Sequence, residues 1–402
     1  MSFTSPHVVA QSTNKAGVGQ LEEIVVRAQK KNRAEDLQEV PAAITAFNEL
    51  QLDRIIYQDL SDLSYSIPNV QLEEIGTFPG VQNFSIRGQG INSSIPSVDP
   101  TVGTFIDGVY VATTYGVVVD NWDLESVEVL RGPQGLLFGR NVSGGAVLMR
   151  NIRPDPQGEF EAKARVMTTN EDREVFSVAA GGPLIEDKLA GRIMLYYEND
   201  DGYYSNKNAL AGAFPSPPFF YKNQQSGNRD LNELETKIAR PSLVWTPNDQ
   251  IEFTLLAEFG NTEGDGAPWT VIDGIDGVIP GQREGVGADG KKLSEFTTTI
   301  DEYGDTDIDW KNVTFETNWD IFGGTLTNIF GYREVDVDAT SDIDGTGLPL
   351  FTATGETDQD QTSNELRFAT RLMDRWDLTV GAYYLTQDVS YDEARYIQGL
   401  LP

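Results

Sequence analysis

Apolar and polar residues alternate with a period of two through most of the second half of the chain. Between residues 251 and 259, for example, one face carries Ile251, Phe253, Leu255, Ala257 and Phe259, and the other carries Glu252, Thr254 and Glu258. Such alternation predicts a strand whose two faces meet different surroundings. After Pro156 we identify nine such stretches, near residues 161–169, 174–181, 189–198, 236–245, 250–259, 310–319, 324–334, 363–371 and 375–387. A soluble β-sandwich has the same period, so alternation alone leaves two kinds of β protein open.

The connections between these stretches alternate in length after the first one. Long loops lie at 199–235, 260–309 and 335–362, and short turns lie at 181–188, 246–249, 320–324 and around Met373-Asp374. Short turns on one rim and long loops on the other are typical of an outer-membrane β-barrel, and a sandwich does not require that order. Aromatic residues near the strand ends are predicted to form the interfacial girdles of such a barrel. They are Tyr196, Tyr197, Tyr203, Tyr204, Trp245, Trp310, Trp319, Trp376, Tyr383 and Tyr384.

The first half of the chain has a different pattern, and its clearest unit runs from Asp123 to Arg150. A strand with Val127 and Val129 on one face leads into a glycine-rich turn, and an apolar strand follows at 146–149. Glycine permits positive φ angles and close approach of backbones. The unit is therefore predicted to be compact and sharply turned.

Short helices and further strands are predicted upstream of that unit. Helical patterns cover residues 48–57 and 59–65. Strand patterns cover 84–87 and 103–110, and the second contains a tight-turn signal at Asp107-Gly108. A mixed α and β unit thus precedes the repeated strands.

Charge and composition exclude several classes of function. The chain has 30 basic and 62 acidic residues, a net charge of −32, so it is not expected to bind nucleic acid. It has no cysteine and a single histidine, His7, which excludes disulfides, Cys/His zinc sites and catalysis by a histidine base. No combination of acid, base and nucleophile is visible, and no cofactor is expected. No apolar run approaches the ~18 residues of a transmembrane helix, but barrel strands need no such run.

Several motifs carry a resemblance to a known family. VEVLRGPQGLLFGRN and SGGAV, within residues 127–147, resemble the signature of the plug domain of TonB-dependent outer-membrane receptors. FSIRGQG (84–90) and VGTFIDGVY (102–110) resemble plug motifs in the family's order. YYENDDGYYSN, ARPSLVWTPNDQIEF and SNELRFAT resemble barrel segments, so the resemblance spans residues 21–387.

The resemblance implies an α+β plug domain followed by antiparallel transmembrane β-barrel strands. It divides the chain into a flexible leader at 1–34, a plug at 35–153 and a partial barrel at 154–402. Receptors of this class have ~22 strands, so nine would make an incomplete barrel and the N-terminal portion of a receptor. SPHVVAQS at the start has neither the charged region nor the full apolar core of a signal peptide. The pattern leaves open whether the sequence is a truncated record or the product of a decayed gene.

The implied function is TonB-dependent uptake of a scarce extracellular ligand across the bacterial outer membrane. In this family the ligand is most often a ferric siderophore, and cobalamin, a glycan or another nutrient is the alternative. The implied partners are the TonB protein, the ligand and outer-membrane lipid, and the implied state is a non-enzymatic monomer. A secreted or surface β-rich binding or adhesion protein is the alternative from another class. The sequence does not identify the ligand, and it does not show whether loops 199–235 and 260–309 close over it.

The resemblance also suggests site residues. LEEIVVRAQ (21–29) resembles the TonB box, which would pair with the TonB protein as an added strand. The residues expected to make this contact are Glu22, Glu23, Ile24, Val25 and Val26. The alternative is that the segment is an ordinary first strand. Arg87 and Arg131 match plug arginines that contact wall carboxylates, and Glu365 matches such a wall position; alternatively, both arginines hold local turns. Ligand contacts are expected at the plug apex, at Gln89, Asn92, Ser93, Ser94, Asp99, Thr113, Thr114 and Tyr115.

One run has the spacing of a calcium loop. Asp305, Asp307, Asp309 and Glu316 occupy its first, third, fifth and twelfth positions. Trp310 stands where the sharp turn needs glycine, and the run leads directly into a predicted strand. We therefore expect an acidic solvated loop here and no metal site.

Overall fold

The computed structural model describes residues 25–26, 30, 35–37, 40–54, 59–75, 78–93, 95–113, 115–116, 122–169, 172–206, 230–269, 296–347, 349–373 and 375–397. Of the TonB-box residues, Glu22, Glu23 and Ile24 lie outside the described residues, as do Ser94 and Thr114. Among the described residues, no helix is both long and apolar enough to cross a membrane.

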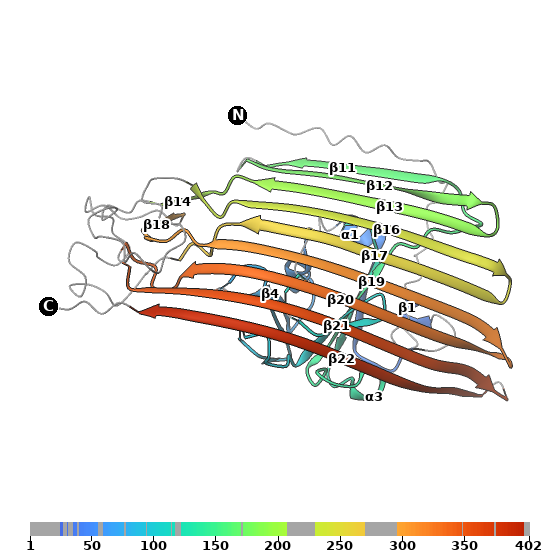
Figure 1. Cartoon of the computed structure of the whole chain (residues 1–402). Coiled ribbons are helices and arrows are strands. Elements are labelled where there is room, and N and C mark those ends of the chain that lie inside the picture. The colour runs from blue at the N-terminus through green and yellow to red at the C-terminus, as the bar shows by residue number, and fades with distance from the viewer. Residues whose placement is uncertain are drawn as a thin grey trace.

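A curved antiparallel sheet of nine long strands forms the larger part of the structure (Figure 1). Its strands pair in chain order, with the bounds β11 Glu161–Thr168, β12 Arg173–Ile185, β13 Leu189–Asp200, β16 Leu234–Asn248, β17 Ile251–Gly264, β19 Asp305–Ile321, β20 Gly324–Asp342, β21 Phe351–Leu372 and β22 Trp376–Ile397. All nine predicted strands are confirmed, and several extend further toward the long loops. We call this sheet the wall.

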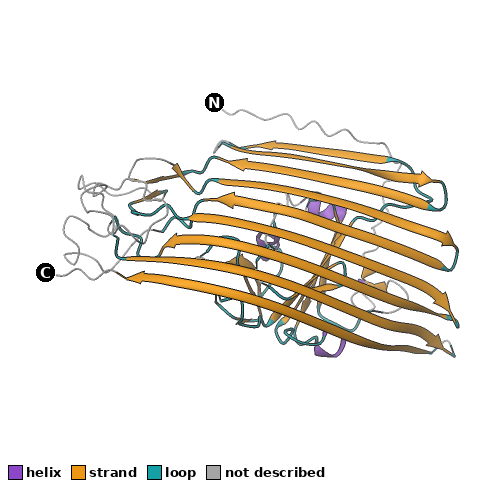
Figure 2. Cartoon of the chain, in the orientation of Figure 1, coloured by secondary structure: helices purple, strands orange, loops and turns teal. Residues whose placement is uncertain are grey.

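Tight turns join the strands at one end of the wall; at the other end the connections are long, except for the four residues between β11 and β12 (Figure 2). At a tight turn between β19 and β20, Phe322 and Gly323 both have positive φ, 55° and 72°. At the opposite end, which we call the outer end, β14 (Tyr204–Asn206) pairs with β15 (Asp230–Leu231) and in parallel with β18 (Thr297–Thr298). Two long connections are therefore hydrogen-bonded to each other.

The two faces of the wall are reversed relative to a soluble sheet. In β17, Thr254 and Glu258 are 0% and 7% exposed on the inner face, whereas Leu255 and Phe259 are 39% and 47% exposed on the outer face. Large apolar side chains are exposed across neighbouring strands too, including Phe176, Leu195 and Phe315. A sandwich would cover its apolar face with a second sheet. An apolar outer face is what a sheet in lipid requires.

The girdle prediction is wrong for two aromatic residues. Tyr196 and Trp310 are buried on the inner face because they pack against the N-terminal unit. Trp245, Trp319 and Trp376 are exposed near the tight turns. The Trp245 ring stacks on Phe253 with 5.2 Å between ring centroids, as expected of an aromatic band at that rim.

The N-terminal unit, which we call the plug, lies on the inner face of the wall (Figure 1). Its main sheet has the order β3-β9-β10-β7-β8, with bounds Ile44–Asn48, Leu124–Arg131, Gly145–Asn151, Val102–Ile106 and Val109–Val111. A smaller sheet contains β4 (Val70–Glu74), β5 (Gln82–Ile86) and β6 (Gln89–Gly90). The helices are α1 (Glu49–Arg54), α2 (Leu60–Ser64) and α3 (Gly135–Phe138).

Local signals explain most of these elements. Asn48 Oδ1 accepts from Gln51 N at 2.9 Å and Gln51 Oε1 accepts from Asn48 N at 3.1 Å, which is a capping box at the start of α1. Asp59 caps α2 by accepting from Ser61 N at 2.6 Å. Asp107 and Gly108 have φ angles of 50° and 85°, as the predicted tight turn requires. The short helix α3, inside the glycine-rich turn, was not predicted.

Strand β9 lies between β3 and β10, with Val127, Val129 and Leu130 at 0% exposure. Glu128, on the opposite face from Val127, is buried as well, because both faces of the plug sheet are covered. Ahead of the plug, Val25–Val26 form β1, which pairs with β2 (Glu35–Asp36). In Figure 1, β1 lies toward the tight-turn end of the wall.

Candidate functional site

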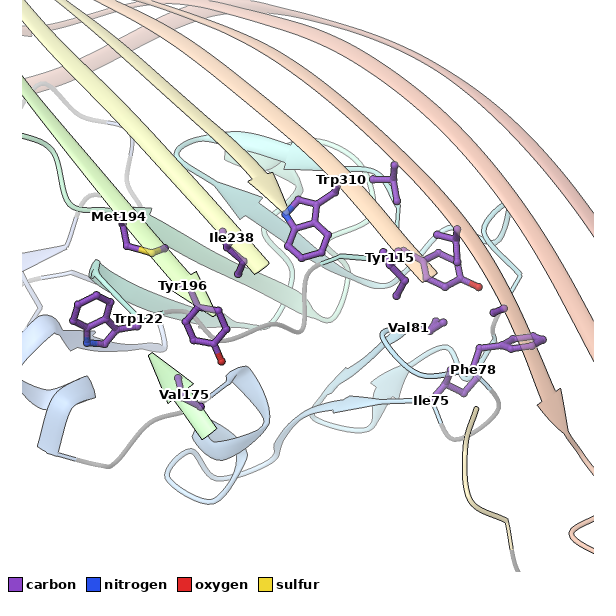
Figure 3. Packing of buried hydrophobic residues seen from close by; sticks show 14 of the residues in the cluster. Ile75, Phe78, Val81, Tyr115, Trp122, Val175, Met194, Tyr196, Ile238 and Trp310 are labelled. Carbon is purple, nitrogen blue, oxygen red and sulfur yellow. The ribbon is translucent and has the colours of Figure 1, made fainter. Parts of the chain in front are cut away.

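An apolar patch joins the plug to the wall. Figure 3 shows Phe78, Tyr115 and Trp122 of the plug packed among side chains of the strands, including Met194 and Trp310. Trp310 is 1% exposed, and its Nε1 donates to Glu258 Oε1 at 2.8 Å. Its ring lies over Gly260 of the neighbouring strand, where a Cβ atom would sit 1.9 Å from the ring. Glycine at position 260 therefore makes room for this contact.

A cluster of wall cations surrounds Trp122 and Asp123 of the plug. Arg192 donates to both carboxylate oxygens of Asp123, at 2.9 and 2.5 Å, and Lys163 Nζ lies 2.9 Å from the same group. Arg240 donates to the Trp122 carbonyl at 3.2 Å, and the Lys163 ammonium lies 4.9 Å from the indole centroid. The side chains of Asp123 and Arg192 are only 3% and 6% exposed, so this pair is desolvated. A buried pair of this kind fixes position strongly, because losing one partner leaves an uncompensated charge.

Other wall side chains hold the plug backbone. Arg333 donates to the carbonyls of Tyr115 at 2.6 Å and Gly116 at 3.3 Å. The Gln361 amide donates to the Tyr110 carbonyl at 2.6 Å and accepts from Ala112 N at 3.0 Å, as a neighbouring strand would. On the plug side, these contacts involve backbone atoms and no side chain. They hold residues 110–112 and 115–116 against the wall.

Two further ion pairs lie nearer the tight turns. Arg153, just after the plug, donates to Glu316 at 2.6 Å. Close by, Asp107 accepts from Asn151 N at 3.0 Å, and burial raises the pKa of the Asp107 carboxyl, an effect that Arg153 partly offsets. Lys30 pairs with Glu365 at 2.8 Å and lies 5.0 Å from the Phe138 ring centroid. Burial lowers the pKa of Lys30, and the Glu365 charge opposes that shift.

The structure changes the expected partners of the plug arginines. In the structure, Glu365 contacts Lys30 and Arg367. Arg87 lies in the turn between β5 and β6 with φ of 54°, and its guanidinium packs against Gly132. Within the described residues, the buried Nε of Arg131 has no hydrogen-bond partner, while its backbone N–H donates to Ala43 O at 2.9 Å. These positions fit the alternative that both arginines hold local turns.

Sequence reasoning missed most of the contacts that do hold the plug. Arg192, Arg240 and Arg333 are isolated cations on predicted strands, and each lies on its strand's inner face beside apolar residues such as Met194, Ile238 and Val335. In an acidic chain, that placement is a usable signal for a partner on the inner face.

The expected ligand residues are scattered. Gln89 and Asn92 are exposed, and Ser93 Oγ accepts from Ile95 N at 3.2 Å. Asp99 binds Arg140 and Asn141, next to α3. Thr113 and Tyr115 are 4% and 2% exposed, so they are packed rather than open to a ligand in this structure.

An acidic cavity of about 200 Å³ lies between the plug and the outer part of the wall. Plug residues Asp59, Glu74 and Gly80 line one side of it. Carboxylates from strand ends line the other, namely Glu198, Asp200, Glu233 and Asp265. Arg173, the one basic residue among the described lining residues, pairs with Glu198. No local pattern in the sequence indicated this cavity, because its lining residues come from eight separate stretches of the chain.

A model of the TonB-dependent Receptor Plug Domain family matches residues 36–146. The chain carries the plug domain of a TonB-dependent receptor. It is 26% identical over 229 residues to the pesticin receptor of Yersinia pestis, which covers 56% of this chain and 30% of that receptor. It is also 26% identical over 184 residues to the ferrioxamine receptor of Yersinia enterocolitica, which covers 45% of this chain and 22% of that receptor. The chain thus spans less than a third of these curated relatives.

Solved structures share the fold. The ferric yersiniabactin uptake receptor FyuA from Yersinia pestis superposes with a TM-score of 0.71 at 19% identity, covering 89% of this chain and 50% of that one. The siderophore receptor PiuA from Acinetobacter baumannii gives 0.67 at 16% identity, covering 90% and 47%. The predicted fold, a plug followed by antiparallel barrel strands, is confirmed. The chain is a protein of the bacterial outer membrane.

We expect Asp123→Ala to loosen the plug strongly. It leaves the desolvated Arg192 without its bidentate partner, although Lys163 keeps its pair with Glu49, and breaking a buried pair costs about 3–5 kcal/mol. Limited proteolysis of the plug and urea unfolding of the full chain in detergent would measure the loss. Asp99→Ala is the matched control, because its pair with Arg140 is more than half exposed and worth at most ~1 kcal/mol. Equal losses in the two variants would contradict the assigned role of Asp123.

We expect Gly260→Ala to displace Trp310, because the new methyl group would collide with the indole ring. Overpacking of this kind costs about 1–3 kcal/mol. Gly135→Ala is the control, since a Cβ there meets open space. The second change in Gly260→Ala/Trp310→Leu should recover part of the loss. A Gly260→Ala protein with unchanged tryptophan fluorescence and unchanged stability would refute the contact.

Proposed function

We propose that this chain is the N-terminal portion of a transporter that takes up a scarce ligand, a ferric siderophore, by TonB-dependent transport across the outer membrane. The observation that carries the proposal is the way the plug is held. Polar pairs with the inner wall retain it, and water can replace such pairs when the plug moves. The pesticin and ferrioxamine receptors among the relatives, and the siderophore receptors among the solved structures, support a ferric chelate as ligand.

The ligand binds above the plug, on the side of the long connections, and TonB acts at the opposite end. Val25 and Val26 offer backbone groups for an added strand, once β1 leaves β2. Force applied there reaches Lys30 first, since it follows β1 in the chain and is tied to Glu365 on the wall. The contacts of Asp123 and Arg333 lie further along the chain and yield later, so displacement of the plug starts at its leader.

No covalent chemistry is part of this function, and the protein is a monomeric receptor rather than an enzyme. Cobalamin or a glycan as ligand is the alternative within the same mechanism. A soluble adhesion protein is disfavoured, because the wall exposes its apolar face and buries its polar one.

The acidic cavity favours a ligand that is not negatively charged. Six carboxylates and one arginine line it among the described residues. A site of this sign attracts cations and repels anions. A cationic or neutral ferric chelate is therefore the preferred cargo.

We expect Val25→Pro, placed in an intact receptor, to abolish uptake while ligand binding to cells is retained. Proline removes the backbone donor that an added strand needs. Uptake of ⁵⁵Fe-loaded siderophore would measure this, with Val18→Pro, upstream of the segment, as the control. Normal uptake by Val25→Pro would refute the TonB-box assignment.

We expect Asp200→Asn/Asp265→Asn to weaken binding of a cationic ferric hydroxamate about tenfold, close to 1.4 kcal/mol. Binding of an anionic ferric chelate should be unchanged or stronger. The control is Asp249→Asn, in a tight turn at the far rim. Identical effects on both chelates, or no salt dependence, would remove the cavity from the binding site and leave TonB coupling untouched.

A further inference from the structure

Four side chains on the inner face of the wall form one hydrogen-bonded row across neighbouring strands. Arg240 Nε of β16 donates to Glu258 Oε2 of β17 at 2.8 Å. The other oxygen of Glu258 accepts from Asn312 Nδ2 of β19 at 2.9 Å, and Asn312 Oδ1 accepts from Arg333 of β20 at 2.6 Å. The four strands are consecutive in the wall. We call the set of Arg240, Glu258, Asn312 and Arg333 the wall network.

Both ends of the wall network hold the plug, at two places along its chain (Figure 3). At one end, Arg240 donates to the Trp122 carbonyl at 3.2 Å. At the other end, Arg333 donates to the carbonyls of Tyr115 at 2.6 Å and Gly116 at 3.3 Å. A single row of wall side chains therefore contacts the plug backbone through its two terminal arginines.

Glu258 lies between these arginines and makes no hydrogen bond to the described part of the plug. Its bonds go to Arg240, Asn312 and Trp310, all of which belong to the wall. Trp310 Nε1 donates to the same Glu258 oxygen as Asn312, at 2.8 Å, so both carboxylate oxygens are held in place. Any effect of Glu258 on the position of the plug is therefore transmitted by its neighbours in the wall.

The wall network contains two buried positive charges and one negative charge. Arg240, Glu258 and Arg333 are 6%, 7% and 2% exposed. Among the described residues, Arg333 donates only to an amide oxygen and two carbonyls, and its Nε has no partner. Charges interact strongly where water is excluded, and a buried cation without a counter-charge is costly. The Glu258 carboxylate thus compensates Arg240 directly and Arg333 through Asn312.

We propose that Glu258 is a positioning residue for the plug, because it fixes both arginines that hold the plug backbone. The contacts at Trp122 and at Tyr115 then depend on one carboxylate that touches neither of them. Without Glu258, two buried guanidinium groups would repel each other and turn toward water, so both contacts would weaken. The part of Glu258 in transport rests on the function proposed above, since these contacts must break when the plug moves.

The first test is hydrogen exchange of the full chain in detergent, followed in peptides that contain Tyr115 and Trp122. Glu258→Gln should accelerate exchange about tenfold at both places, because both arginines lose their counter-charge. Arg333→Gln should accelerate exchange at Tyr115 only, since Glu258 still holds the other arginine. The matched control is Glu252→Gln, on the same strand and face but nearer the tight turns, which should leave both places unchanged.

A double-mutant cycle in urea gives a readout that a general loss of stability would not produce. In the wild type, Arg240→Gln should be destabilising, because it removes a contact with the plug. In the Glu258→Gln background, the same change removes an uncompensated charge and should raise the ratio of folded to unfolded protein about tenfold. If Glu258→Gln alone does not fold, recovery of folding in Glu258→Gln/Arg240→Gln is the same result.

Two outcomes would overturn the proposal. One is accelerated exchange at only one of the two places in Glu258→Gln, or no more acceleration than in Glu252→Gln. The other is an Arg240→Gln change that destabilises the protein equally with and without Glu258. Neither measurement needs a ligand or TonB, so either result is independent of whether the intact receptor takes up a ferric chelate.

Discussion

The polarity of the wall is the constraint on which the rest of the structure depends. The sheet presents apolar side chains outward and polar ones inward, as burial along β17 illustrates with Leu255 and Thr254. Whatever fills the inner side must therefore satisfy buried polar groups, because leaving them unpaired is costly. The plug does so with Asp123 toward Arg192, with backbone carbonyls toward Arg333, and with Trp310 packed where Gly260 leaves space.

This arrangement makes the plug both well placed and removable. The apolar patch between plug and wall is bordered by ion pairs and amide contacts that water can replace. The contacts are also unevenly distributed along the plug. The leader is attached to the wall through Lys30 and Glu365, whereas the segment from Tyr110 to Asp123 is held at several points. A pull on the leader would meet the weaker attachment first.

Part of the net charge of −32 lies where the proposed ligand enters. Carboxylates line the cavity beside the plug, and three more converge beyond it in the outer connections. Such groups repel one another unless cations neutralise them. A cationic or neutral ligand, as proposed above, would reduce that repulsion.

The sequence by itself determined the architecture. Alternation predicted nine strands in the right places, loop lengths predicted the two rims, and Asp107-Gly108 predicted a tight turn, because each depends on neighbours in the chain. The glycine-rich motif indicated the plug in the same local way. Only the tertiary structure decided which side chains meet across the interface. Lys30 and Glu365 are 335 residues apart, and Asp123 and Arg192 are 69 apart. The contact of Glu365 with Lys30 and the acidic cavity were missed for the same physical reason. Strand register and the position of the plug bring these groups together, and the local sequence determines neither of them.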